Sequence, residues 1–345
     1  MKYLLLGVAS LFMISCTSQN ETKQIDADSL ISLESYTIPM NQQGATISKA
    51  VGIEGVPTLS QDTAQIFNIN NKGEITLNEG IQLTTNSPFK YEIELTYGDK
   101  KKSFILVKDE FIKNGVIAHR GAWKHHEVSQ NSIGSLKAAI ALGCEAAEFD
   151  VWYSSDNEII LSHDPEIGGL KLEENIGADL KKVELLSGEF VPSLNDYLEL
   201  IKTQNKTKVV LEIKVSQKGA ERNRELTDAV VNAVHTAKAQ AWVDYICFSF
   251  DNIKRVSELD KTAHTAYLET NKALEEIKEA KISGIDYHFS SFEKDSTLID
   301  RCNQLGLTTN FWTVNEELIM QKLLNAGARF ITTDEPELAL SLVQK

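Results

Sequence analysis

The sequence predicts a (β/α)8 barrel, a closed ring of eight parallel strands with helices outside, preceded by a small all-β domain. Three observations favour this fold class. After Phe111, apolar runs alternate with amphipathic helical stretches, and eight strands fit into the rest of the chain. From about Ser29 to Lys108, the runs are short, alternate every second residue and show no helical periodicity. An open doubly wound sheet usually carries a Gly-rich first turn, which the stretch from Phe111 lacks.

Residues 29–112 form the expected all-β domain. The stretch "KYEIELTYGDKKKSFILVK" contains two period-two strands around Gly98-Asp99, which is typical of a hairpin. Further short runs separated by Asn-Gly-type turns predict a sandwich of immunoglobulin or cadherin type. The region has no cluster of His, Asp or Glu, so we expect a spacer or adhesive role, with carbohydrate binding as the alternative.

Residues 113–345 form the expected barrel. Its strands are expected at 115–119, 146–151, 208–213, 244–249, 265–269, 285–289, 308–313 and 329–333. Helical stretches lie between them, for example "SLNDYLELIKTQ" and "NEELIMQKLLNAG". The count of strands favours the barrel over the doubly wound sheet.

Bulk composition narrows the function. The chain has 345 residues, 42% of them hydrophobic, and a formal net charge of -14. It offers no basic cluster for a nucleic-acid backbone and no broad positive surface for anionic lipid. Cys144 and Cys247 lie in apolar runs, and no cysteine pair has metal-ligand spacing, so buried free thiols are expected.

The first residues predict export. "MKYLLLGVASLFMIS" combines an early lysine with an apolar core too short to span a bilayer, and small residues precede Cys16. This resembles a bacterial lipoprotein signal (1–15), which implies lipidation at Cys16 and a polar tether over 16–28. We therefore expect a lipid anchor at the bacterial cell envelope, outer membrane, periplasmic or surface, as the membrane contact. A plain secretory signal is the alternative.

Polar residues gather at the ends of the expected strands, where barrel enzymes carry their active sites. The candidate site residues are His119, Arg120, Glu148, Asp150, His163, Glu212, Lys214, His288 and Trp312.

Spacing and residue type predict the chemistry of this set. Glu148 and Asp150 are two apart on one strand and so share a face, as do Glu212 and Lys214. Three converging carboxylates repel one another unless a hard divalent cation, Ca²⁺ or Mg²⁺, lies between them. Histidines beside a metal-bound phosphate act as base and acid, while arginine and lysine hold its oxygens. The pattern predicts metal-assisted phosphodiester cleavage.

Six blocks in order carry a family resemblance: "AHRG", "EFDV", "LSHDP", "LEIK", "FWTVN" and "FITTDEPELA". Together they resemble the glycerophosphodiester phosphodiesterase family across 113–345. The resemblance implies a TIM barrel that hydrolyses glycerophosphodiesters to glycerol 3-phosphate and an alcohol with Ca²⁺ or Mg²⁺. It also implies site roles: catalytic His119 and His163; metal-binding Glu148, Asp150 and Glu212; phosphate-binding Arg120 and Lys214; and Trp312 beside the organic group.

One motif departs from the family. Ser129-Gln130-Asn131 replaces the common Pro-Glu-Asn, which reduces negative charge near the phosphate. The segment 165–191 is short and predicts a small cap. We expect His125 and His126 to be solvated loop residues and Asp334 to be the N-cap of the last helix.

Two other functions stay open from the sequence. Related barrels of the sphingomyelinase D type suggest phospholipase D-like cleavage of lysolipids, which an apolar loop beside the mouth would favour. A non-catalytic surface binding protein is the other alternative, against which the complete acid, base and metal set argues. The sequence leaves head group and oligomeric state open.

Overall fold

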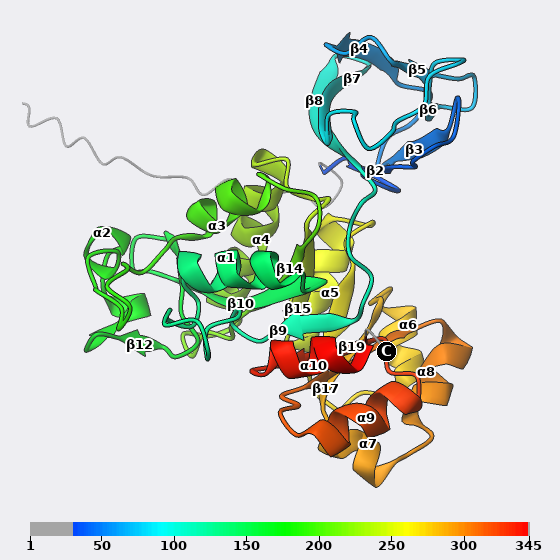
Figure 1. Ribbon diagram of the computed structural model, residues 1–345. Helices are drawn as coiled ribbons and strands as arrows, with labels where there is room; N and C mark the ends of the chain where they lie inside the picture. The colour runs from blue at the N-terminus through cyan, green and yellow to red at the C-terminus, as the bar shows by residue number, and fades with distance from the viewer. Residues whose placement is uncertain (1–29, 344–345) are drawn as a thin grey trace, which may run out of the picture.

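The computed structural model describes residues 30–343. The predicted signal, the lipidation site Cys16 and the tether lie outside these residues. Within them the chain forms a small all-β part and a larger barrel, joined by the stretch between β8 and β9 (Figure 1). The predicted boundary at 112/113 lies in this stretch. No helix among the described residues is long and apolar enough to cross a membrane.

The all-β part consists of two four-stranded sheets, in the orders β1-β3-β6-β5 and β2-β8-β7-β4. Aromatic side chains join the sheets, since the rings of Phe67 and Tyr91 meet edge to face at 5.6 Å. The strands are β1 Ser32–Leu33, β2 Thr37–Ile38, β3 Thr46–Val51, β4 Thr58–Asp62, β5 Phe67–Ile69, β6 Glu74–Leu77, β7 Lys90–Tyr97 and β8 Lys100–Lys108.

The predicted hairpin is confirmed. β7 and β8 pair from Lys90 opposite Val107 to Tyr97 opposite Lys100, which leaves Gly98-Asp99 as the two-residue turn. Gly98 has a φ of 58°, the left-handed value that such tight turns require. The alternating burial of β7 places Ile93 and Leu95 in the core.

The barrel is closed, as predicted. Its strands follow the order β10-β14-β15-β16-β17-β18-β19-β9, and β9 pairs in parallel with both β19 and β10. All eight expected strands are present: β9 Val116–Ala118, β10 Ala146–Tyr153, β14 Lys208–Ile213, β15 Val243–Cys247, β16 Thr265–Tyr267, β17 Gly284–His288, β18 Thr308–Trp312 and β19 Phe330–Thr333.

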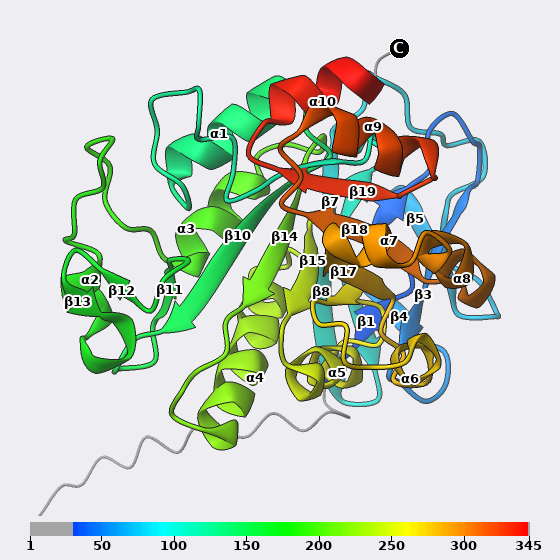
Figure 2. The ribbon, with the colours of Figure 1, turned by 90° about the horizontal axis from the view of Figure 1, so that it is seen from below.

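Helices surround the strands on the outside (Figure 2). Their apolar stripes pack on the barrel: α4, for example, buries Leu226, Val230 and Val234, which lie four residues apart. The helices are α1 Ile133–Leu142, α2 Gly177–Leu180, α3 Leu194–Ile201, α4 Ala220–Thr236, α5 Phe250–Leu259, α6 Leu274–Glu279, α7 Ser290–Lys294, α8 Leu298–Leu305, α9 Glu317–Asn325 and α10 Pro336–Val343.

A small cap follows the second barrel strand. β10 turns back into the short antiparallel strand β11 (Ile159–Leu161), after which β12 (Glu166–Ile167) pairs with β13 (Leu170–Lys171). A 3₁₀ turn and α2 complete the segment. The cap has its own apolar cluster around Trp152, Ile160 and Leu172.

The all-β part contacts the barrel at the amino-terminal ends of its strands. Ser32 Oγ donates to Asp260 Oδ1 at 2.7 Å, and Asn205 Nδ2 donates to Lys108 O at 2.9 Å. Asp260 and Asn205 lie in the loops that precede β16 and β14. The all-β part therefore lies on the face of the barrel opposite the carboxyl ends of the strands.

The three cysteines in the described residues, Cys144, Cys247 and Cys302, are free and buried. Burial raises the pKa of Cys144 and of Cys247 to about 12. They are packing residues, as expected for Cys144 and Cys247.

Candidate active site

Three buried carboxylates meet at the carboxyl ends of β10 and β14. Asp150 and Glu212 are register partners on these neighbouring strands, and Glu148 lies two residues before Asp150 on the same face. One oxygen of each lies within 4.8 Å of the others. The side chains are buried by the surrounding barrel, so the predicted convergence of the three acids is found.

Charge in this cluster is only partly balanced. Lys214 Nζ lies 3.0 Å from Asp150 Oδ1 and 2.8 Å from Glu212 Oε1. Glu148 accepts a hydrogen bond from the backbone N–H of Arg120 at 2.9 Å, and the Arg120 side chain approaches Asp150 at 4.0 Å. One buried ammonium and a more distant guanidinium are the cationic groups beside three carboxylates, so the cluster keeps an excess of negative charge.

The pKa values follow from this imbalance. Burial, with the negative charges of Asp150 and Glu212, raises the pKa of Glu148 well above its usual range. Burial and Asp150 likewise raise the pKa of Glu212 to about 8. Burial opposes the ionisation of Asp150, but Lys214 and Asn131 hold its pKa below the usual value. The set fits a divalent cation, because only more positive charge lets all three acids ionise together.

Arg120 is placed by an unusual backbone. Its φ of 57° lies in the left-handed region, and Gly121 follows with a φ of 80°. A Cβ on Gly121 would lie 2.4 Å from Ser135 Oγ and 2.7 Å from the Ser135 backbone carbon. The glycine is therefore required for the chain to turn away from β9 against α1, and the turn aims the backbone N–H of Arg120 at Glu148.

The Arg120 side chain has an unused donor. Its Nη1 donates to Gln130 Oε1 at 2.8 Å, so the amide of the Ser-Gln-Asn motif binds the guanidinium as a neutral acceptor. Its Nε is buried and has no hydrogen-bond partner within residues 30–343. An anionic oxygen beside Asp150 would satisfy this donor.

The two predicted catalytic histidines are each held through Nδ1 by a carboxylate. His119 Nδ1 lies 2.8 Å from Asp334 Oδ1, and His163 Nδ1 lies 2.8 Å from Asp164 Oδ1. In the described chain neither Nε2 has a hydrogen-bond partner. Burial, then the positive charge of Lys214, lowers the pKa of His163.

The role expected for Asp334 is corrected by the structure. It does not cap α10, because its two carboxylate oxygens bond to His119 and to Asn315 Nδ2. The Thr333 hydroxyl instead accepts from the backbone N–H of Glu335 at 2.9 Å. The sequence signal is an acid straight after the eighth strand, a position that also fits a helix cap.

The remaining candidates lie around this centre. Trp312 Nε1 donates to Asp286 O at 2.9 Å, and its ring meets that of His288 at 5.3 Å, on the side of the mouth formed by β17 and β18. His288 lies on this side of the mouth and is not one of the three residues that could hold a metal ion. His125 and His126 pair at 2.7 Å with Glu335 and Glu337 and lie outside the acid cluster.

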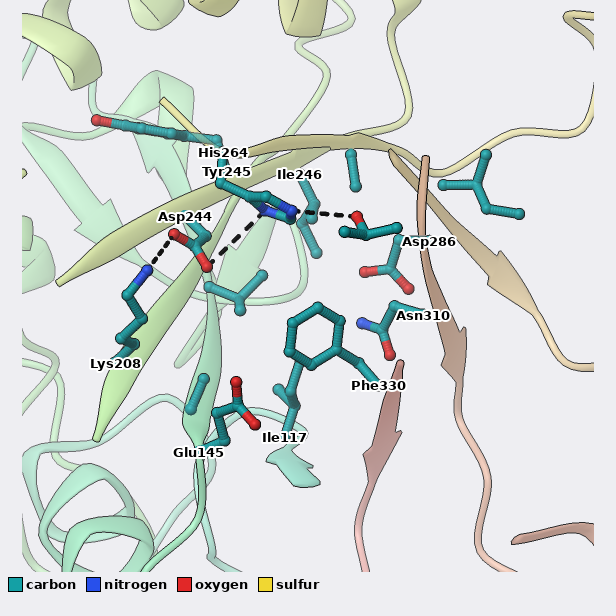
Figure 3. A pocket seen from close by; sticks show the side chains of 15 residues that line it. Ile117, Glu145, Lys208, Asp244, Tyr245, Ile246, His264, Asp286, Asn310 and Phe330 are labelled. Carbon is teal, nitrogen blue, oxygen red and sulfur yellow. Dashed lines mark hydrogen bonds and ion pairs between the residues drawn. The ribbon is translucent and has the colours of Figure 1, made fainter. Parts of the chain in front are cut away.

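An enclosed cavity at the other end of the barrel is not the site. It has a volume of about 30 Å³, enough for one or two waters and not for an ester. Figure 3 shows Lys208, Asp244 and His264 on one side of it and Asp286 and Asn310 on the other. Oδ1 of Asp286 and Oδ1 of Asn310 are buried with no hydrogen-bond partner in residues 30–343.

A closed barrel with acids, imidazoles and cations at the carboxyl ends of its strands defines a (β/α)8-barrel enzyme of phosphate-ester chemistry. The profile of the glycerophosphoryl diester phosphodiesterase family matches residues 119–338. The chain belongs to this family and is a phosphodiesterase.

Named relatives agree with the family. A glycerophosphodiester phosphodiesterase from Caldanaerobacter subterraneus subsp. tengcongensis is 27% identical over 247 residues, which cover 68% of this chain and 99% of that protein. The crystal structure of a glycerophosphodiester phosphodiesterase from Parabacteroides distasonis is similar with a TM-score of 0.65 and 34% identity, covering 67% of this chain and 96% of that one.

A third similar structure is a complex with a small molecule. It is an Oleispira antarctica phosphodiesterase in complex with the product sn-glycerol-3-phosphate. Its TM-score is 0.58 and its identity is 22%, with coverage of 67% of this chain and 96% of that chain. At 22% identity, this similarity shows a shared fold alone.

Proposed function

We propose that this protein hydrolyses glycerophosphodiesters to glycerol 3-phosphate and an alcohol, with one divalent cation, Ca²⁺ or Mg²⁺. The observation that carries the proposal is the meeting of Glu148, Asp150 and Glu212 within 4.8 Å, with the cationic side chains of Lys214 and Arg120 beside them. The glycerol 3-phosphate product in the Oleispira antarctica enzyme supports the same product here.

The three carboxylates hold the metal, which when bound supplies Lewis-acid polarisation of the phosphoryl group. Arg120 and Lys214 hold the non-bridging oxygens and offset the charge that grows in the transition state. The Nε of Arg120, which has no hydrogen-bond partner within residues 30–343, supports this role.

His119 and His163 transfer the protons through Nε2, one accepting from the attacking oxygen and the other donating to the leaving alkoxide. A carboxylate on Nδ1 of each ring orients Nε2 for this task. The neutral ring accepts a proton at Nε2, and the ring that is protonated on both nitrogens donates one there. The attacking oxygen belongs to water or to the substrate's own hydroxyl, which would form a cyclic phosphate. Trp312 shapes the organic side of the site.

Glycerophosphocholine turnover tests the proposal. Purified enzyme should release glycerol 3-phosphate, lose activity with chelator and regain it with Ca²⁺ or Mg²⁺. His119→Ala should abolish turnover, whereas His126→Ala, a control at a histidine outside the acid cluster, should not. No turnover of several head groups with either metal present would refute the proposal.

A second candidate is cleavage of lysolipids, and a surface feature of the cap favours it. The side chains of Ile176, Leu186 and Phe190 are 45%, 106% and 56% exposed. Leu186 also lines a pocket of about 340 Å³ together with His163 and Gln130. This pocket, with Leu186 in its lining, has room for the start of an acyl chain.

Lysophosphatidylcholine tests this candidate against glycerophosphocholine. If lysolipids are substrates, Leu186→Ser should lower kcat/KM for lysophosphatidylcholine and leave kcat/KM for glycerophosphocholine unchanged. Turnover of glycerophosphocholine alone would rule the candidate out.

We further propose that the protein is a lipoprotein of the bacterial cell envelope, anchored through Cys16, with the all-β part as spacer. The position of that part on the face opposite the site supports a spacer, because it leaves the mouth open. Cys16→Ser should release the protein from membranes in fractionation; membrane retention of that variant would argue against the anchor.

A further inference from the structure

A second pocket opens at the carboxyl ends of β15 to β18. It has a volume of about 450 Å³, and Phe248, Leu268, His288 and Trp312 form an aromatic and apolar wall. The rings of Phe248 and Trp312 meet edge to face at 5.7 Å. The volume is within the roughly 300–1,000 Å³ typical of ligand pockets, so there is room for more than a three-carbon glycerol group.

The strand order divides the mouth of the barrel into two halves. His119 and the carboxylates follow β9, β10 and β14, whereas the pocket follows the next four strands round the ring. Trp312 borders the pocket and also packs against the apolar cluster inside the barrel that includes Ile117 and Val210. A diester whose phosphate lies on the acidic half can therefore extend one organic group into this pocket.

Several charged side chains line the pocket, and two of them have no partner within residues 30–343. Lys272 is bound to Glu276 at 3.3 Å, and Arg301 is bound to Asp295 at 2.7 Å. Glu269 and Lys294 line the same pocket, and within residues 30–343 neither has an ion-pair or hydrogen-bond partner. The pocket thus offers one free carboxylate and one free ammonium.

Two hydroxyls at the pocket also lack partners. Tyr287 is 3% exposed, and its Oη is buried with no hydrogen-bond partner in the described residues. The buried Oγ of Ser291 is in the same state. A buried polar group without a hydrogen-bond partner destabilises the fold, so such groups beside a pocket indicate a polar ligand.

We propose that this pocket binds the alcohol group of the diester and is matched to an alcohol that carries both an ammonium and a carboxylate, as serine does. Glu269 pairs with the ammonium, Lys294 with the carboxylate, and Phe248 and Trp312 flank the carbon chain. The inference rests on the proposed function, since it concerns the substrate of that same reaction.

Three diesters separate the two contacts. Glycerophosphoserine carries both charges, glycerophosphoethanolamine only the ammonium, and glycerophosphoglycerol neither. Lys294→Ala should lower kcat/KM about three- to tenfold for the serine ester alone. Glu269→Gln should lower it by a similar factor for the serine and ethanolamine esters and leave the glycerol ester unchanged. Lys278→Ala and Glu279→Gln, exposed charges on α6 outside the pocket, are the matched controls.

The results of these assays test the pocket assignment and the proposed hydrolysis separately. Wild-type preference for the serine ester, lost as described in the two variants, supports the pocket. If the enzyme hydrolyses the three esters and neither variant changes their ratios, the pocket assignment is wrong while the proposed function stands. If no ester is hydrolysed with metal present, both fail.

Discussion

Asp334 and His119 join the last strand of the barrel to the first. Asp334 Oδ1 lies 2.8 Å from His119 Nδ1, and the backbone N–H of His119 donates to Thr333 O at 2.9 Å. Asn315 holds the carboxylate from the other side, with Nδ2 2.8 Å from Oδ2. Closing the ring therefore also sets the orientation of the imidazole.

Asp334→Asn should lower kcat by about 10- to 100-fold with little change in KM. Acid–base catalysis contributes on the order of 10²–10⁴-fold, and a misoriented ring loses part of this. Steady-state kinetics on glycerophosphocholine measures the effect. Glu335→Gln, which removes the neighbouring carboxylate that pairs with Lys124 and His125, should keep kcat. Equal kcat values for Asp334→Asn and wild type would argue against the positioning role.

Bound metal should stabilise the folded protein as well as activate the enzyme. At a hundred times its Kd, a ligand of the native state adds about 2.7 kcal/mol. For a domain of this size we expect a rise in Tm of roughly 5–10 °C with Ca²⁺ or Mg²⁺. Thermal unfolding with and without chelator measures it. Glu212→Gln should reduce the rise, and an unchanged Tm in wild type at saturating metal would contradict a site at the three acids.

Gly121→Ala should destabilise the protein by about 2–5 kcal/mol. The added Cβ would clash with Ser135, and residue 121 has a φ of 80°, in the left-handed region. The steric clash therefore adds to the backbone strain. Gly169→Ala is the control, because its φ is 78° but nothing lies within 4 Å of the added Cβ. Its cost should be about 1–2 kcal/mol. Urea unfolding compares the two, and equal losses would show that contact with Ser135 does not matter.

Asp286 should make stability fall as the pH rises. Burial raises its pKa to about 7 from the ordinary 3.8. The folded state then holds a proton that the unfolded state has lost between about pH 4 and pH 7. The stabilisation is complete below pH 4 and is lost as the pH approaches 7, by at most about 4 kcal/mol.

Unfolding free energies at pH 5 and pH 8 test this effect. Asp286→Asn should remove most of the pH-dependent difference, because an amide does not ionise beside the cavity shown in Figure 3. Asp300→Asn, at an exposed position on α8, should keep it. A full difference in Asp286→Asn would mean that other groups cause it.

Local pattern accounts for much of the fold that was predicted. The hairpin of β7 and β8 follows from alternating residues around Gly98-Asp99, and the eight barrel strands follow from short apolar runs between amphipathic helices. These signals lie within about twenty residues of one another and are therefore readable along the chain. The pairing of Asp150 with Glu212 was predictable in part, because each ends a buried strand in a parallel sheet.

The sequence by itself determined the barrel, the all-β region before it, and the acids, histidines and cations of the candidate site. Only the tertiary structure decided that Asp334 holds His119 and that the all-β part lies opposite the mouth. It also decided that Glu269 and Lys294 line one pocket with no partner among residues 30–343. The physical reason is distance along the chain: residues as far apart as 119 and 334 meet only when the ring closes. Packing, not periodicity, determines which charged side chains have partners and which do not.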